Sequence, residues 1–122
     1  MKFHQSTTGN AKIFTAHGPD HVNVNGERYD HSIAVTPTEI HVDWRVAGFG
    51  ELNEKHFEYF LTLKPDVLLL GTGARQHFPH PSLYRALTDA GISVECMDTP
   101  AACRTYNILA AEDRRVVAAI II

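Results

Sequence analysis

Three short apolar segments in the second half of the chain restrict the fold more than any other feature: residues 67–70, 92–97 and 116–122. Helical periodicity separates them, with helices expected at 51–63, at 81–90 and from Thr99 onward. Short apolar strands that alternate with helices are typical of parallel strands joined by right-handed crossovers, with both faces of the sheet covered. The second half of the chain therefore predicts an α/β arrangement.

The first third has the alternating pattern of antiparallel strands. A strand is expected at 11–16 and a turn at 17–20. The alternating run at 21–25 ends on Asn25-Gly26, a strong signal for a two-residue hairpin turn. A β-hairpin is therefore expected before the α/β part of the chain.

A second alternating run follows a break at Thr36-Pro37-Thr38. Residues 40–45 place Ile40, Val42 and Trp44 on one side and polar residues on the other. Period-two alternation of this kind predicts an antiparallel strand with one face open to water.

Together these patterns predict a three-layer, single-domain α/β fold over residues 11–122. It has a mixed, largely parallel central sheet, flanking helices and an additional antiparallel β-hairpin layer. Residues 1–10 are expected to be a flexible leader. The chain has 122 residues, 44% hydrophobic and 20% charged, which suffices for one core and excludes the disordered class.

The charge pattern excludes a nucleic-acid partner. The formal net charge is −3, and no basic run is longer than Arg114-Arg115. No apolar run approaches the roughly 18 residues of a membrane span, and the first ten residues lack the apolar core of a signal peptide. We therefore expect a cytoplasmic protein without membrane insertion.

A glycine-rich segment, Gly71-Thr72-Gly73-Ala74-Arg75, follows the apolar strand at 67–70. Ligands of open α/β sheets bind beyond the carboxyl ends of the strands, and glycines there let backbone amides approach an anion. Arg75 would add a guanidinium. The segment lacks the Lys-Ser or Lys-Thr of a phosphate-binding P-loop, so a tight turn at the strand exit is the alternative.

The strand at 92–97 leads into a helix through Asp98-Thr99-Pro100. Thr99 is expected to cap this helix with Pro100 at its first position, which would offer an anion site at the helix N-terminus. If the strands at 67–71 and 92–97 are neighbours, Gly73, Arg75 and Thr99 would surround one cleft.

The same helix carries an unusual density of polar side chains. Helical spacing puts Cys103 and Asn107 on one face, which predicts that the amide satisfies buried backbone groups. Two hypotheses remain open for the helix. In one, Asp98, Cys103, Thr105 and Asn107 form a structural network. In the other, Arg104 and Tyr106 contact a ligand or partner beside Gly71, Thr72, Gly73, Arg75 and Thr99.

Catalytic and metal signals are weak. Cys103 lies in the first turn of a helix but has no histidine near it in sequence, so catalysis by its thiol is disfavoured. The eight histidines form no set with cysteines or carboxylates at ligand spacing. We expect no catalytic residue, no metal and no cofactor, and a non-enzymatic role is favoured.

Combined motifs along the chain resemble those of one small family. They are Val24-Asn25-Gly26 and Arg28, Pro37, Trp44, Gly71-Thr72-Gly73, Asp98-Thr99-Pro100, Ala102-Cys103, Thr105-Tyr106-Asn107, Leu109, Glu112 and Arg114. The family includes the mitochondrial assembly factor three of respiratory complex I, an adipogenesis-associated protein, and uncharacterised bacterial and archaeal proteins. The resemblance implies a three-layer α/β fold with an added hairpin. It supplies no catalytic residue or cofactor.

Two functions follow as expectations. The first is a soluble interaction module with a protein partner, acting in the assembly of respiratory or other complexes, as the resemblance implies. An exposed patch around Trp44, Phe49 and Phe78 would favour it. The alternative is a binding protein, or an enzyme without a recognisable motif, that takes a small molecule or a small anion in a cleft at the strand carboxyl ends.

Overall fold

The computed structural model describes residues 11–122, and the leader expected at 1–10 lies outside them. Within residues 11–122, eight strands form two sheets. The three-stranded antiparallel sheet has the order β1-β2-β3, made of β1 (Phe14–Gly18), β2 (His21–Val24) and β3 (Glu27–Tyr29). The turn between β2 and β3 contains Asn25 and Gly26 with φ of 51° and 86°, as the hairpin signal predicts.

The five-stranded sheet has the order β5-β4-β8-β6-β7. Its strands are β4 (Ile33–Val35), β5 (Ile40–His41), β6 (Val67–Gly71), β7 (Ser93–Met97) and β8 (Val116–Ile120). The strands β8, β6 and β7 are parallel, whereas β4 joins β8 and β5 in antiparallel pairs. The sheet is therefore mixed with a parallel core, as the sequence predicts.

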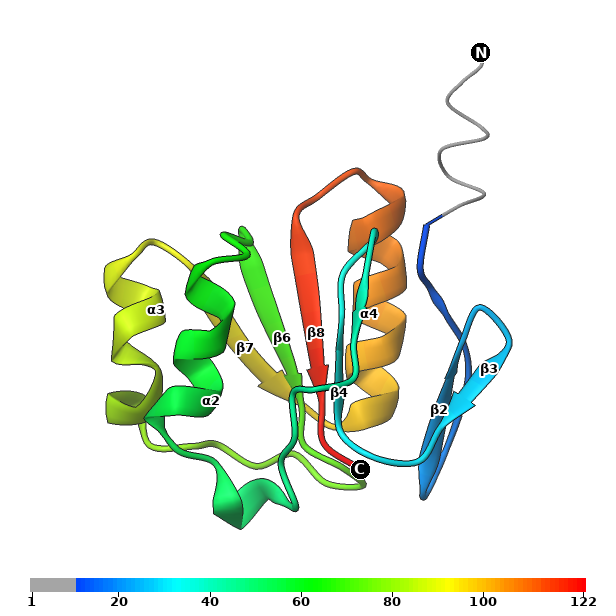
Figure 1. The fold of residues 1–122 in the computed structure, drawn as a ribbon, viewed down its shortest axis with the longest axis horizontal. Helices are drawn as coiled ribbons and strands as arrows, with labels where there is room; N and C mark the ends of the chain where they lie inside the picture. Colours follow the sequence, from blue (N-terminus) through cyan, green and yellow to red (C-terminus); the bar gives the residue numbers. More distant parts are fainter. Residues whose placement is uncertain (1–10) are drawn as a thin grey trace.

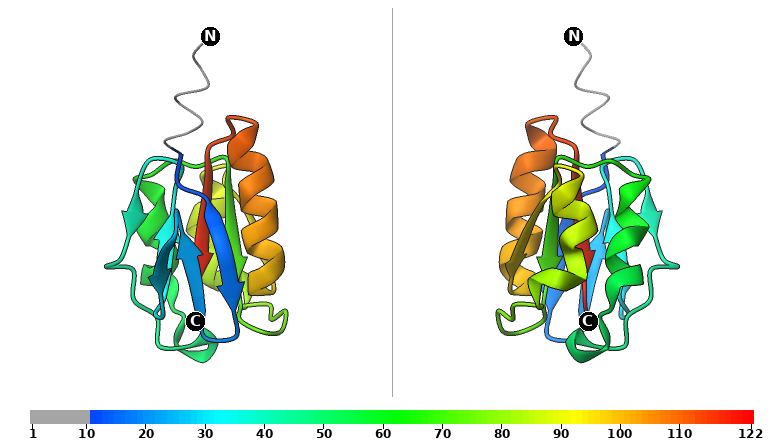
Figure 2. Two further views of the ribbon diagram at one scale, coloured as in Figure 1. Left: turned by 90° about the vertical axis from the view of Figure 1, so that its right-hand side faces the viewer. Right: turned by 90° about the vertical axis from the view of Figure 1, so that its left-hand side faces the viewer.

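Helices cover both faces of this sheet (Figures 1 and 2). One face carries α2, which begins at 54, and α3, with three short 3-10 segments nearby. The other carries α4, with the three-stranded sheet packed beside it (Figure 2, left). The bounds are η1 (Phe49–Glu51), α2 (Glu54–Glu58), η2 (Tyr59–Leu61), η3 (Pro81–Tyr84), α3 (Arg85–Asp89) and α4 (Thr99–Ala111).

Strand β6 separates two hydrophobic cores. Val67 and Leu69 face the core shared with α4 and the hairpin sheet, and Leu68 and Leu70 face the core shared with α2 and α3. Because successive side chains of a strand point to opposite faces, a continuous apolar run supplies both cores. This accounts for the absence of polar alternation in the segment.

The strand predicted at 40–45 ends early. Only Ile40–His41 is a strand, and the chain then turns, leaving Val42 45% exposed. Trp44 is buried, and its indole N–H donates to the His56 carbonyl at 2.9 Å. The Ser32 hydroxyl holds this stretch by donating to the Trp44 carbonyl. The anchoring of Trp44 against α2 therefore overrides the period-two pattern.

Two further predictions need correction. The helix expected at 51–63 begins only at 54, because Asn53 caps it by accepting from the amides of Lys55 and His56, and α2 is followed directly by η2. The strand at 92–97 is not fully buried: β7 lies at the sheet edge, with Ser93 and Glu95 exposed.

Candidate functional site

The carboxyl ends of β6 and β7 meet the start of α4, as the neighbouring-strand hypothesis requires. Gly71 pairs with Met97, and the Thr72 amide donates to the Met97 carbonyl at 2.9 Å. The Thr72 side chain is buried, and its hydroxyl oxygen accepts from the His77 amide at 3.1 Å. Thr72 therefore organises the loop after β6, and its side chain is not free for a ligand.

Gly71 packs closely against α4 and β8. A Cβ placed there would lie 2.9 Å from Ile120 Cδ1 and 3.2 Å from both Ala102 Cβ and Thr99 Oγ1. The lack of a side chain is therefore a packing requirement, and the glycine needs no ligand to explain it.

The N-terminus of α4 is not arranged as predicted. Asp98, and not Thr99, is the N-cap, and its carboxylate accepts from the Ala101 amide at 2.8 Å. The Ala102 amide donates to the Asp98 carbonyl, the Thr99 amide donates to the Gly73 carbonyl, and Pro100 has no N–H. Since the first-turn amides are engaged and a carboxylate stands beside them, this helix end offers no ready anion cradle.

Thr99 and Gly73 form a reciprocal pair instead. The Gly73 amide donates to the Thr99 hydroxyl at 2.9 Å, while the Thr99 amide donates to the Gly73 carbonyl at 2.8 Å. Gly73 has a φ of +94°, a conformation that glycine adopts without strain. The pair fixes the loop after β6 against α4.

Two polar side chains of α4 attach the hairpin sheet to the helix. The Asn107 amide oxygen accepts from the Phe14 N–H at 2.9 Å, and its NH₂ group donates to the Phe14 carbonyl at 2.8 Å. The Tyr106 hydroxyl donates to the Lys12 carbonyl at 2.7 Å. Asn107 thereby pairs with the edge of β1 as a neighbouring strand would.

Tyr106 therefore cannot serve as the ligand contact that the sequence suggested, because its side chain is wholly buried against Phe14 and the central sheet. Cys103 is also buried, and burial raises the pKa of its thiol to about 12. A thiol of that kind is a poor nucleophile at neutral pH. Thr105 is half-buried, with no side-chain hydrogen bond in the described part of the chain.

The two arginines proposed for the cleft do not meet there. Arg75 and Arg104 are both exposed, and neither lines the pocket at this end of the sheet. Of the residues predicted to bind a ligand, only Gly73 and Thr99 line this pocket.

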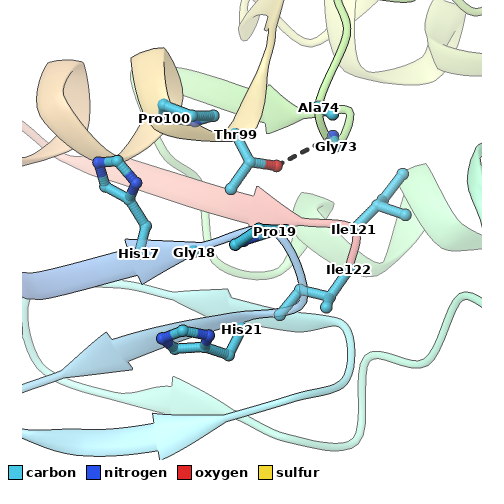
Figure 3. A pocket seen from close by; sticks show the side chains of 10 residues that line it. All are labelled: His17, Gly18, Pro19, His21, Gly73, Ala74, Thr99, Pro100, Ile121 and Ile122. Carbon is cyan, nitrogen blue, oxygen red and sulfur yellow. Dashed lines mark hydrogen bonds between the residues drawn. The ribbon is translucent and has the colours of Figure 1, made fainter.

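That pocket has a volume of about 350 Å³ and opens between the β1–β2 turn and the start of α4 (Figure 3). Its lining residues come from four segments that are distant in sequence: His17, Gly18, Pro19, His21, Gly73, Ala74, Thr99, Pro100, Ile121 and Ile122. The sequence pattern missed the residues of the β1–β2 turn, because nothing local indicates that this turn reaches the central sheet.

A second feature lies on the loop after β6. Phe78 is 72% exposed, the most exposed of the large hydrophobic residues described. The neighbouring His77 ring packs on Phe49, with 5.0 Å between ring centroids. Trp44 does not join this surface because it is buried, so the predicted aromatic patch reduces to Phe49 and Phe78.

Within residues 11–122, no group of three or more His, Cys, Asp or Glu side chains is placed to hold a metal ion. In the same range, no helix has the length and apolar character needed to span a membrane.

Comparison with known proteins identifies related chains. Residues 14–121 match a family described as "Protein of unknown function (DUF498/DUF598)". NADH dehydrogenase [ubiquinone] 1 alpha subcomplex assembly factor 3 of Danio rerio is 36% identical over 111 residues, covering 89% of this chain and 63% of that protein. The Bos taurus protein of the same name is 38% identical over 100 residues, covering 80% of this chain and 54% of that protein. The chain thus spans less than two-thirds of the length of these relatives.

Solved structures have the same fold. A crystal structure of a Bordetella parapertussis protein has a TM-score of 0.85 and 42% identity, covering 91% of this chain and 95% of that one. An NMR structure of a Xanthomonas campestris protein has a TM-score of 0.84 and 38% identity, covering 99% of this chain and 92% of that one.

Proposed function

This chain belongs to the DUF498/DUF598 family, and we propose that it is a protein-interaction module acting in the assembly of a multi-subunit complex. The observation that carries the proposal is its similarity to proteins named as assembly factors of NADH dehydrogenase. The finer proposal is that the complex is the respiratory NADH dehydrogenase and that the protein acts on it from the cytoplasm.

Cys103 and Tyr106 are buried in the core, so the surface that meets a partner has to be made of other, exposed side chains.

The surface we assign to the partner is the loop between β6 and η3, centred on Phe78. An exposed aromatic side chain is a frequent anchor of protein interfaces. Residues 71–88 contain Arg75, Arg85 and two histidines but no aspartate or glutamate. We therefore propose a partner that offers an apolar pocket for Phe78 within an acidic surface.

The test is deletion of the gene in its host, followed by complementation. The amount of assembled NADH dehydrogenase is read from native gels with in-gel activity staining. We expect the deletion to lower the assembled enzyme, wild type to restore it, and Phe78→Ser to restore it poorly.

Ile108→Ser is the matched control, because Ile108 is 60% exposed on α4, away from the loop. It should complement as well as wild type. Normal assembly in the deletion strain would refute the proposed function, and equal complementation by the two serine variants would remove Phe78 from the interface.

A further inference from the structure

Strand β7 is an edge of the five-stranded sheet, with β6 on one side and, within residues 11–122, no strand on the other (Figure 1). We propose that a second copy of this chain pairs with this edge, so that two β7 strands run antiparallel about a two-fold axis at Val94. This self-association is separate from partner binding at Phe78. It follows from the free backbone groups of the edge and from the charges beside them.

The backbone groups of β7 alternate between β6 and the edge. The Ser93 amide donates at 3.2 Å to the carbonyl of Asp66, the residue before β6. Ser93 therefore directs its backbone groups toward the parallel neighbour. Because successive residues of a strand direct these groups to opposite sides, Val94 and Cys96 direct theirs toward the edge.

Two groups at the ends of this edge are already bonded inside the chain. The Cys96 carbonyl accepts from the side-chain amide of Gln76 at 2.9 Å, and the Ile92 amide donates to the Leu87 carbonyl at 2.9 Å. Four groups remain without a protein partner in the described part of the chain: the Ile92 carbonyl, the Val94 amide and carbonyl, and the Cys96 amide. Free groups in a row on an edge strand are a template for another strand.

These four groups complement a second copy of themselves. With the two-fold axis at Val94, each Val94 amide donates to the other Val94 carbonyl, and Ile92 stands opposite Cys96 of the second copy. The Cys96 amide then donates to the Ile92 carbonyl across the axis. The Ile92 amide and the Cys96 carbonyl, which would otherwise have to bond to each other, are the two groups with internal partners. Four hydrogen bonds therefore join the strands.

The same register keeps like charges from lying opposite each other. It places the exposed Ser93 opposite the exposed Glu95 of the second copy, where a hydroxyl can donate to a carboxylate. An axis at Glu95 would set the two carboxylates directly opposite each other. An axis at Cys96 would require its carbonyl, which Gln76 occupies. Val94 is therefore the axis that both the hydrogen bonds and the charges favour.

The test is amide hydrogen exchange of the ¹⁵N-labelled full chain from about 50 μM to about 1 mM, with the mass in solution measured by sedimentation. We expect a dimer to form in this range, and protection of the Val94 and Cys96 amides to rise with concentration. The Glu95 amide is the internal control. It faces β6, as the Ser93 amide does, and should be protected at every concentration.

Charge variants at Ser93 test the register. Ser93→Glu puts a carboxylate opposite Glu95 twice in each dimer, and should weaken association about fivefold or more. Ser93→Lys puts an ammonium group there and should strengthen association by a similar factor. Ser93 is exposed in the free chain, so thermal unfolding of the dilute variants should stay close to wild type.

Three outcomes would overturn the proposal: a single-chain mass at every concentration, concentration-dependent protection confined to other strands, or equal effects of the two charges at Ser93. Phe78→Ser should associate as wild type does, because Phe78 lies on the loop after β6 and not on the edge. None of these outcomes bears on complementation by Phe78 variants, so the two proposals fail separately.

Discussion

Asn107 holds the hairpin sheet to α4, and its replacement by leucine gives a quantitative test of that role. Two hydrogen bonds are lost, to the N–H and the carbonyl of Phe14. Leucine fills a similar volume, so cavity formation contributes little. Each net hydrogen bond contributes about 0.5–1.5 kcal/mol, which gives a loss of about 1–3 kcal/mol in the free energy of unfolding.

Urea unfolding followed by circular dichroism measures this loss directly. Hydrogen exchange shows whether the effect is local. The Phe14 amide should lose protection, while amides of the parallel strands should change only as much as the global free energy of unfolding does. Arg104→Leu is the matched control, since it introduces the same residue at an exposed position of the same helix. It should change stability by less than about 0.5 kcal/mol.

Two results would show that the Asn107 amide does not hold the hairpin sheet to α4. One is an Asn107→Leu protein as stable as wild type with an equally protected Phe14 amide. The other is a loss in Arg104→Leu that equals the loss in Asn107→Leu, since the effect would then belong to leucine on α4 and not to the amide contacts.

Three further changes test the packing, the helix cap and the buried thiol. Gly71→Ala should cost about 1–3 kcal/mol in unfolding experiments, because its Cβ would collide with α4 and β8, while Gly48→Ala, with nothing within 4 Å, should be neutral. Asp98→Ala should cost about 0.5–2 kcal/mol in thermal unfolding, because the Ala101 amide loses its acceptor; equal melting temperatures would contradict the capping role. The Cys103 pKa is raised from 9.0 to about 12, so the folded state holds this proton more tightly and stability falls as pH rises from 9 toward 12. Cys103→Ala should make that alkaline slope shallower, and an unchanged slope would show that the thiol does not contribute.

Local sequence patterns were sufficient to predict much of the fold. The uninterrupted apolar run of β6 predicts a strand buried on both faces, and Asn25-Gly26 predicts the tight hairpin because both residues tolerate positive φ. The alternation of Ser93 and Glu95 with apolar neighbours was a readable sign that β7 lies at the edge of the sheet.

The predictions were wrong where contacts with segments distant in sequence determine the position of a side chain. Tyr106 is buried because the hairpin sheet packs beside α4, and no local pattern gives that position. Trp44 leaves the expected strand because its indole bonds to α2. At the start of α4, Asp98 and Thr99 are both good capping residues, and Thr99 is instead paired with Gly73.

The sequence predicted where in the fold the candidate pocket lies, but not most of the residues that line it. The rule that ligands bind at strand carboxyl ends identified Gly73 and Thr99, which do line the pocket. Arg75 and Arg104 were chosen for their charge, and both are exposed and absent from the lining of the pocket. His17 was overlooked because its strand belongs to the other sheet.

The proposed role in the assembly of a complex can be tested on the protein in its host. The most direct measurement is its migration on native gels of host membranes and cytosol, after mild cross-linking and with NADH dehydrogenase subunits detected in parallel. We expect the protein to migrate with partly assembled forms of the enzyme and to be absent from the mature complex. This association should be lost in Phe78→Ser but not in Ile108→Ser. Migration only at the mass of the free chain, while intermediates are present, would contradict it.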